Sequence, residues 1–324
     1  MKKYFLGVDT GATKSHALIV DENATPLGFG SGGAGNWEVV GWDGVEITLN
    51  KILLDACQQA KIPPSQISGA GFGLAGFDWE EDRAPHLEII RKIGISSPIN
   101  LVNDAFIGLP AGTDAGWGVV VSAGTSCNCY GRNQKGKIGR VTGAYFLGEY
   151  AGAGELVGRA KQVVAHAWTR RGASTKLTEA FLNITGAENP EDLLAGLMRG
   201  KYHIGADSAP LVFQIAEEGD AVAQELIHWA GYELGELAKA VIRQLNIADE
   251  AVDIVLAGSF YKGSPIIQEK MAENIRTLAP KANLIRLKTS PVVGATLLGM
   301  EAGGIDAPPL RHVLAEKFEG FGKH

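Results

Sequence analysis

The sequence predicts an α/β fold made of two similar units, each built around a mixed β-sheet. Strand-like and helix-like segments alternate along most of the chain, which is the pattern of α/β proteins. A run of three strands at the N-terminus recurs about one domain later, near residue 116, as expected of an internally duplicated fold. The chain has 324 residues, 45% of them hydrophobic, so it can bury two cores. The predicted domains are residues 1–114 and 115–300, and a helix over about 300–324 packs back on the first domain.

The first half of the chain is predicted to open with three strands and to continue with a β-α-β unit. The turn signals "DTGA" and "DENATP" separate the opening strands, and Pro63-Pro64 end the first helix. The last strand ends at Asn103-Asp104. The predicted strands cover 4–9, 14–20, 26–31, 67–74 and 99–103, and the predicted helices cover about 43–61 and 79–93.

The second half repeats the strand opening and is then rich in helices. The segment "GWGVVVSAGTSCNCYGRNQKGKIGRV" contains three predicted strands, and aligning Gly11 with Gly124 places Thr13 on Ser126. A buried strand follows in "AVDIVLAGSF", and a last helix begins near Pro291. Helical periodicity covers 149–171, 176–183, 190–198, 208–218 and 220–246.

The composition excludes several classes of partner. A net charge of −6 gives no basic surface for nucleic acid or anionic lipid. The N-terminus lacks the apolar run of a secretory signal, and no apolar stretch is long enough to cross a bilayer. Cys57, Cys127 and Cys129 are too few for a disulfide framework, and no CxxC or HExxH motif offers a metal site. We therefore expect a cytoplasmic protein that binds neither nucleic acid nor membranes.

Two motif matches fail on their context. "GRNQKGKI" (131–138) has isoleucine where a P-loop needs serine or threonine, and it lies between predicted strands, so we interpret it as a hairpin turn. "GFGLAG" (71–76) fits the dinucleotide fingerprint better, because it follows a strand and precedes a helix, with Asp104 ending the next strand. That acid lies beyond the typical spacing of about 20 residues. We favour a glycine-lined strand end that a ligand or another backbone approaches closely.

The stretch "DTGATK" that follows the first strand has the composition of a phosphate-binding turn. Gly11 can take a positive φ, which lets successive backbone N–H groups converge on an anion. Thr10 and Thr13 add hydroxyl donors, and Lys14 can add a cation. Asp9 would be repelled by phosphate unless a cation lay between them, and a magnesium-bound nucleotide meets that condition. Taken alone, the stretch is equally consistent with an ordinary hairpin.

Two later loops offer the same chemistry. Gly124, Thr125 and Ser126 form a turn after the first strand of the second unit, and Gly258 and Ser259 follow a buried strand. Open α/β sheets place ligands at such strand ends. Two loops that face each other across a cleft would hold one polyphosphate from both sides.

These three motifs resemble, in the same order, the two phosphate motifs and the adenosine motif of the actin, hexokinase and Hsp70 ATPase superfamily. More narrowly, the N-acetylglucosamine kinase and BadF/BadG-type ATPase family is similar in the segments "GNW" (35–37), "NDA" (103–105), "SAGTSCNC" (122–129) and "GAYFLGEYAGAGEL" (143–156). The resemblance covers nearly the whole chain. It implies two actin-like domains with ATP in the cleft between them, and a homodimer.

By this resemblance, the protein transfers the γ-phosphoryl group of ATP to the 6-hydroxyl of an amino sugar. Asp104 is the implied base for the hydroxyl proton, and Asp9 is implied to orient Mg²⁺ through water. Phosphoryl transfer needs chiefly an aligned hydroxyl, an acceptor for its proton, and donors or metal for the phosphate charge. Capping the following helix is the alternative role of Asp104. The implied nucleotide- and phosphate-binding residues are Thr10, Gly11, Thr13, Lys14, Gly124, Thr125, Gly258 and Ser259, and the implied sugar-binding residues are Asn36, Trp37, Gly76, Asp104, Thr125, Ser126 and Glu149.

Two departures from the family pattern leave the sugar open. The family motif resembles "GDEGSA" where this chain has "GEYAGA" (148–153), and the longer arm of Glu149 would move the ligand or select another. Trp37 directly follows Asn36, where the family often has one residue between them. N-acetylglucosamine, glucosamine and related amino sugars all remain candidates.

Three other functions stay open at the sequence level. The first is a BadF/BadG-type ATPase that activates a partner dehydratase or reductase, because related activators hold an iron–sulfur cluster between subunits. Cys127 and Cys129 alternate on a predicted strand and face the same way, but those ATPases use widely separated cysteines, so we favour packing. A sugar sensor without turnover and a dinucleotide enzyme are the other two.

Overall fold

The structure is a computed structural model that describes residues 2–141 and 150–321. It contains two five-stranded mixed sheets with the strand orders β3-β2-β1-β4-β5 and β10-β9-β6-β7-β8. In each sheet the strand that comes first in the sequence is central, pairs antiparallel with the second, and pairs parallel with the fourth. This repeated topology confirms the predicted duplicated α/β fold. The first sheet contains β1 (Tyr4–Thr10), β2 (Ser15–Asp21), β3 (Pro26–Gly32), β4 (Ile67–Leu74) and β5 (Ile99–Asn103).

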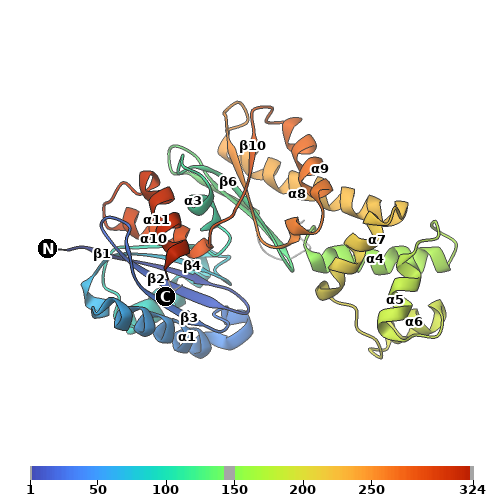
Figure 1. Ribbon diagram of the computed structural model, residues 1–324, viewed down its shortest axis with the longest axis horizontal. Coiled ribbons are helices and arrows are strands. Elements are labelled where there is room, and N and C mark those ends of the chain that lie inside the picture. Colours follow the sequence, from blue (N-terminus) through green and yellow to red (C-terminus); the bar gives the residue numbers. More distant parts are fainter. Residues whose placement is uncertain (1, 142–149, 322–324) are drawn as a thin grey trace.

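The first sheet is buried on both faces because side chains alternate along its central strands. In β1, Leu6 and Val8 pack in one core with helices α1 (Trp37–Ala60) and α2 (Arg83–Lys92). Phe5 points the other way and packs with α10 (Pro291–Ala302) and α11 (Arg311–Gly320). Figure 1 shows α1 on one side of this sheet, and α10 and α11 on the other.

Glycines allow α10 to lie very close to the sheet. A Cβ atom at Gly71 would lie 2.0 Å from the Ala295 carbonyl oxygen, and one at Gly299 would lie 2.3 Å from the Leu6 carbonyl oxygen. Gly71 is inside β4, so "GFGLAG" is a strand approached by another backbone, as we interpreted it. The 114/115 domain division stays a prediction, and the chain already lies against the first sheet from Pro291 onward.

The second unit contains six of the described α-helices, α4 to α9. It contains β6 (Gly118–Ala123), β7 (Cys127–Arg132), β8 (Ile138–Val141), β9 (Asp253–Ala257) and β10 (Asn283–Arg286), which pack with α8 (Ala221–Leu245) and α9 (Pro265–Arg276). Between β8 and β9 the chain forms α4 (Ala153–Trp168), α5 (Leu177–Thr185), α6 (Pro190–Met198) and α7 (Ala209–Glu217). Figure 1 shows α4 to α7 at the end of the molecule opposite to the first sheet.

A small shared core joins the two units. The short helix α3 (Gly108–Gly112) contains Leu109 and is preceded by Phe106. Both side chains pack with Val120 and Tyr130 of the second sheet and with Leu298 of α10. The two sheets are therefore connected by buried apolar contact as well as by the chain.

Several element boundaries differ from the prediction for identifiable reasons. Helix α1 begins at Trp37, six residues before the predicted start at 43, because Asn36 caps it and Gly41 takes a φ of 67° that permits a kink. Helix α2 begins at Arg83 because residues 80–82 form a separate 3₁₀ turn. The short strand β10 was not predicted. The "GRNQKGKI" hairpin is confirmed, because Asn133 donates its N–H to the Lys137 carbonyl oxygen at 3.0 Å between β7 and β8.

None of the described helices combines the length and apolar character that crossing a membrane requires.

Candidate active site

Two carboxylates, Asp9 and Asp104, lie at the same end of the first sheet. Asp9 is near the end of β1, Asp104 follows Asn103 at the end of β5, and the parallel strand β4 lies between them. Burial raises the pKa of both carboxyls to about 7; the charge of Lys14 opposes this rise at Asp9, whereas the charges of Asp9 and Asp78 add to it at Asp104. A carboxylate with a pKa near 7 is suited to accept a proton at neutral pH.

The turn after β1 is a tight hairpin. Gly11 donates its N–H to the Lys14 carbonyl oxygen at 2.9 Å, and its φ is not positive. The predicted convergence of N–H groups at Gly11 is therefore wrong, because closing the hairpin uses that donor. Thr10 is buried, and its hydroxyl accepts the N–H of Ala75 at 3.2 Å. Of the predicted phosphate ligands in this turn, Thr13 and Lys14 are the exposed ones.

The second and third loops meet at a cavity in the second unit. Gly124, Thr125 and Ser259 line this cavity of about 660 Å³, together with residues of α7 and of 260–263. Gly258 has a φ of +97°, and a Cβ atom there would lie 2.1 Å from the Ala123 carbonyl oxygen, so only glycine permits this approach of the two loops. Within the described chain, the turn at 11–14 does not contribute to the cavity lining.

Three predicted sugar-binding residues are brought together at the start of α1. The indole N–H of Trp37 donates to the Gly76 carbonyl oxygen at 2.7 Å. Gly76 has a φ of +79°, and a Cβ atom there would lie 2.6 Å from Asn36 Oδ1. That oxygen accepts the N–H of Glu38 at 2.8 Å, so part of the Asn36 amide caps the helix.

A partly buried cluster of aromatic rings behind Trp37 was not predicted from the sequence. Trp37 and Trp42 stack with ring centroids 5.0 Å apart, and His86 meets Trp42 edge-on at 4.9 Å. His86 is fully buried with Nδ1 2.7 Å from the Asp82 carbonyl oxygen, and burial lowers its pKa, so the ring is neutral at pH 7. These ring contacts fix the indole of Trp37, which holds the Gly76 carbonyl oxygen. Trp37 and Trp42 belong to α1 and His86 belongs to α2, so no local sequence pattern predicts their contact.

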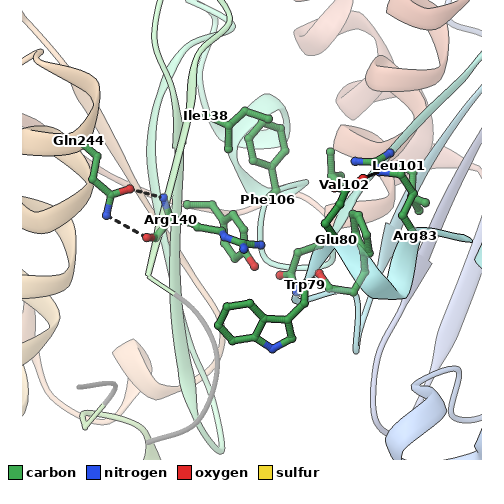
Figure 2. A pocket seen from close by; sticks show the side chains of 12 residues that line it. Trp79, Glu80, Arg83, Leu101, Val102, Phe106, Ile138, Arg140 and Gln244 are labelled. Carbon is green, nitrogen blue, oxygen red and sulfur yellow. Dashed lines mark hydrogen bonds and ion pairs between the residues drawn. The ribbon is translucent and has the colours of Figure 1, made fainter. Parts of the chain in front are cut away.

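A groove of about 430 Å³ lies between β5 and β8, the edge strands of the two sheets (Figure 2). Arg140 of β8 donates to the carbonyl oxygen of Asp78, and its guanidinium carbon lies 5.3 Å from the ring centroid of Trp79. Asn103 Nδ2 donates to Asp78 Oδ1 at 2.9 Å, and Asn103 Oδ1 accepts the Ala105 N–H at 2.8 Å. Asp78 and Arg140 are 62 residues apart, so sequence patterns did not connect them.

The loop at 124–126 is docked on the start of α4. Ala153 and Gly154 donate their N–H groups to the carbonyl oxygens of Gly124 and Thr125, both at 2.9 Å. Ser126 is exposed in this loop. Glu149, the remaining predicted sugar ligand, lies outside the described residues.

Glu155, in the first turn of α4, is a further acidic residue that the sequence analysis did not single out. Its Oε2 atom is buried without a hydrogen-bond partner among the described residues, and burial raises its pKa. Cys127 and Cys129 are buried in the core of the second unit, in agreement with the packing role that we favoured.

Comparison with known proteins identifies the family. The model of the BadF/BadG/BcrA/BcrD ATPase family matches residues 6–299. The chain belongs to this family. The family consists of ATPases, so membership implies that the protein uses ATP. Membership also confirms the family resemblance that the sequence motifs indicated.

Two curated relatives and one solved structure match almost end to end. An N-acetylmuramic acid/N-acetylglucosamine kinase of Clostridium acetobutylicum is 26% identical over 91% of this chain and 98% of its own length. An N-acetyl-D-glucosamine kinase of Dictyostelium discoideum is 26% identical over 93% of this chain and 99% of its own length. A crystal structure of a Chromobacterium violaceum protein assigned as an N-acetylglucosamine kinase superimposes with a TM-score of 0.66, at 26% identity, over 91% of this chain and 98% of that one.

Proposed function

We propose that the protein is an ATP-dependent sugar kinase that transfers the γ-phosphoryl group to the 6-hydroxyl of an amino sugar, N-acetylglucosamine or glucosamine. The observation that carries this proposal is the carboxyl of Asp104, which follows β5 at the end of the first sheet with a pKa of about 7. A sugar hydroxyl is a weak nucleophile that needs such an acceptor for its proton. Similarity to amino sugar kinases over nearly the whole chain supports the choice of substrate.

The nucleotide is proposed to lie across the two units. Gly124, Thr125, Gly258 and Ser259 would hold it at the 660 Å³ cavity. From the first unit, Thr13 and Lys14 would approach the phosphates, and Thr10 and Gly11 would shape the hairpin that carries them. Closure of the two units would exclude water and favour transfer over hydrolysis.

Magnesium is proposed to bind beside Asp9. The chemistry of the site fits, because burial raises the pKa of both carboxyls and the charge of Asp9 further raises the pKa of Asp104, and a cation would relieve this repulsion. Magnesium usually keeps several waters and is held by one or two carboxylates plus substrate phosphates. Asp9 would orient the ion through water, and the ion would neutralise charge on the phosphates.

The sugar is proposed to lie between Gly76 and Asp104 on one side and Thr125, Ser126 and Glu149 on the other. Asn36 and Trp37 would shape the near wall, since Trp37 already holds the Gly76 carbonyl oxygen. We also propose a cytoplasmic homodimer that acts in amino sugar metabolism, on the grounds of composition and family resemblance.

A substrate panel tests the proposal. Purified protein with Mg·ATP is given amino sugars and hexoses in turn, and ADP release is compared with a no-sugar control. We expect N-acetylglucosamine or glucosamine to raise ADP release at least tenfold. ADP release that no sugar alters would favour the second candidate, an ATPase that activates a partner dehydratase or reductase, which family membership supports. That candidate also requires iron in the purified protein.

A further inference from the structure

Gly76, which we place in the wall of the sugar site, is held in position from two directions. The indole N–H of Trp37 donates to its carbonyl oxygen at 2.7 Å. Phe77, the next residue in the chain, meets the ring of His86 edge-on with centroids 5.8 Å apart. His86 also meets Trp42 edge-on at 4.9 Å, and Trp42 stacks on Trp37 at 5.0 Å. Both routes to Gly76 therefore begin at His86.

The stack of Trp37 on Trp42 depends on the kink in α1. Side chains five residues apart on a regular helix point in directions about 140° apart, so their rings cannot lie face to face. Gly41, between the two tryptophans, has a φ of 67° and a ψ of 171°, and the two ring planes are only 7° apart. A Cβ atom at Gly41 would have no atom within 4 Å, so the backbone conformation, and not lack of room, requires glycine there. The kink brings the two indoles together.

A hydrogen bond fixes the orientation of the His86 ring. The side chain is fully buried, and Nδ1 lies 2.7 Å from the carbonyl oxygen of Asp82. A carbonyl oxygen only accepts, so Nδ1 carries the proton and donates. This bond sets the rotation of the ring, and with it the contacts to Trp42 and Phe77. Phenylalanine could supply the ring and asparagine could supply the donor, whereas histidine supplies both.

We propose that His86 is a positioning residue for the sugar, and that it acts through the rings of Trp42 and Phe77. The proposal rests on the proposed kinase function, because it takes Gly76 as part of the sugar site. His86 is fully buried, so it acts on a ligand only through its neighbours. A wall that binds the sugar equally before and during phosphoryl transfer affects KM and leaves kcat unchanged. The expected signature of His86 is therefore a change in KM alone.

Two substitutions in the full-length protein separate the ring from the donor. His86→Phe keeps the ring and removes the bond to Asp82, whereas His86→Asn keeps a donor near the position of Nδ1 and removes the ring. We expect His86→Phe to fold, because Nε2 is buried without a hydrogen-bond partner among residues 2–141 and 150–321, so no bond is lost there. His228→Asn is the control for loss of a histidine, because His228 is exposed on α8 of the second unit.

We expect both His86 variants to raise the KM for N-acetylglucosamine or glucosamine about fivefold or more, the size of one aromatic contact or hydrogen bond. The kcat should stay within about twofold of wild type. Near-UV circular dichroism without ligands should change in both variants, because the stacked indoles shift, and His228→Asn should match wild type throughout. A lower urea midpoint with unchanged KM and unchanged dichroism would make His86 a purely structural residue and overturn the proposal.

A double-mutant cycle tests the route from His86 to the sugar. Trp42→Leu removes the ring that lies between His86 and Trp37. Adding His86→Asn to Trp42→Leu should therefore raise the KM by a smaller factor than His86→Asn does in wild type. Two effects that simply multiply would show that His86 does not act through Trp42, and the route would be refuted.

Calorimetric binding of the same sugars separates this proposal from the kinase proposal. If wild type binds a sugar without phosphorylating it, the kinase proposal fails, and the positioning role stands if both His86 variants weaken that binding about fivefold or more. Phosphorylation at an unchanged KM in both variants would refute the positioning role and leave the kinase intact. A wild-type protein that neither binds nor phosphorylates either sugar would overturn both proposals.

Discussion

At the scale of single residues, the account depends on the ionisation of Asp104. Its carboxyl has a pKa of about 7 because of burial and the charges of Asp9 and Asp78. A general base acts in its ionised form, so we expect kcat/KM for the sugar to fall about tenfold for each pH unit below the pKa. The measurement is kcat/KM for N-acetylglucosamine between pH 5.5 and pH 8.5 at saturating Mg·ATP. A flat profile over this range would argue against Asp104 as the base.

The same carboxyl should reduce the stability of the protein at neutral pH. The pKa of Asp104 is raised above its ordinary value of 3.8, so the folded state holds a proton that the unfolded state loses as the pH rises from about 4 to 7. The free energy of unfolding should therefore decrease over that interval. We expect Asp104→Asn to be more stable than wild type at pH 8, by up to about 4 kcal/mol, and equal to it at pH 4. Urea unfolding at both pH values, without ligands, measures the difference.

At the scale of elements, Asn36 and Trp37 at the start of α1 lie so close to Gly76 that residue 76 has no room for a side chain. A Cβ atom would lie 2.6 Å from Asn36 Oδ1 and 2.7 Å from Trp37 Cδ1, and the φ of +79° is itself unfavourable for alanine. We expect Gly76→Ala to raise the KM for the sugar about tenfold and to destabilise the protein by about 1–3 kcal/mol. Gly33→Ala is the control, because no atom lies within 4 Å of a Cβ atom there. Equal sugar kinetics in both variants would contradict the proposed sugar wall.

Elements were predictable where periodicity was strong and local. The strands β1 and β4 were predicted within about a residue at each end, and β9 lies inside the segment 251–260 where a buried strand was predicted. The strand β10 has only four residues, and none is fully buried. The predicted start of α1 at 43 is too late, because Asn36 caps the helix at Trp37 and the chain only kinks at Gly41. Gly11 can take a positive φ by its residue type, but its φ is not positive in the hairpin, where its N–H bonds to the Lys14 carbonyl oxygen.

At the scale of the whole molecule, the duplication was visible in the sequence and the contacts between the two units were not. The loops at 11 and 124 could be aligned because each follows the first strand of its sheet. The contact of Arg140 with Asp78 joins β8 of the second sheet to the loop that follows β4 of the first sheet. Within the first unit, the edge-on contact of Trp42 with His86 joins two helices. Such pairs depend on tertiary packing, which no local pattern records.

The central claim is that this molecule transfers phosphate to an amino sugar with Asp104 as the base. The most direct test follows the product by mass spectrometry and ³¹P NMR in wild type and in Asp104→Ala, with Mg·ATP and N-acetylglucosamine or glucosamine, while ATP binding is measured in parallel. We predict a 6-phosphate from wild type, formation slower by at least about a hundredfold in Asp104→Ala, and unchanged ATP binding in both. Product formation by Asp104→Ala at the wild-type rate would contradict the account.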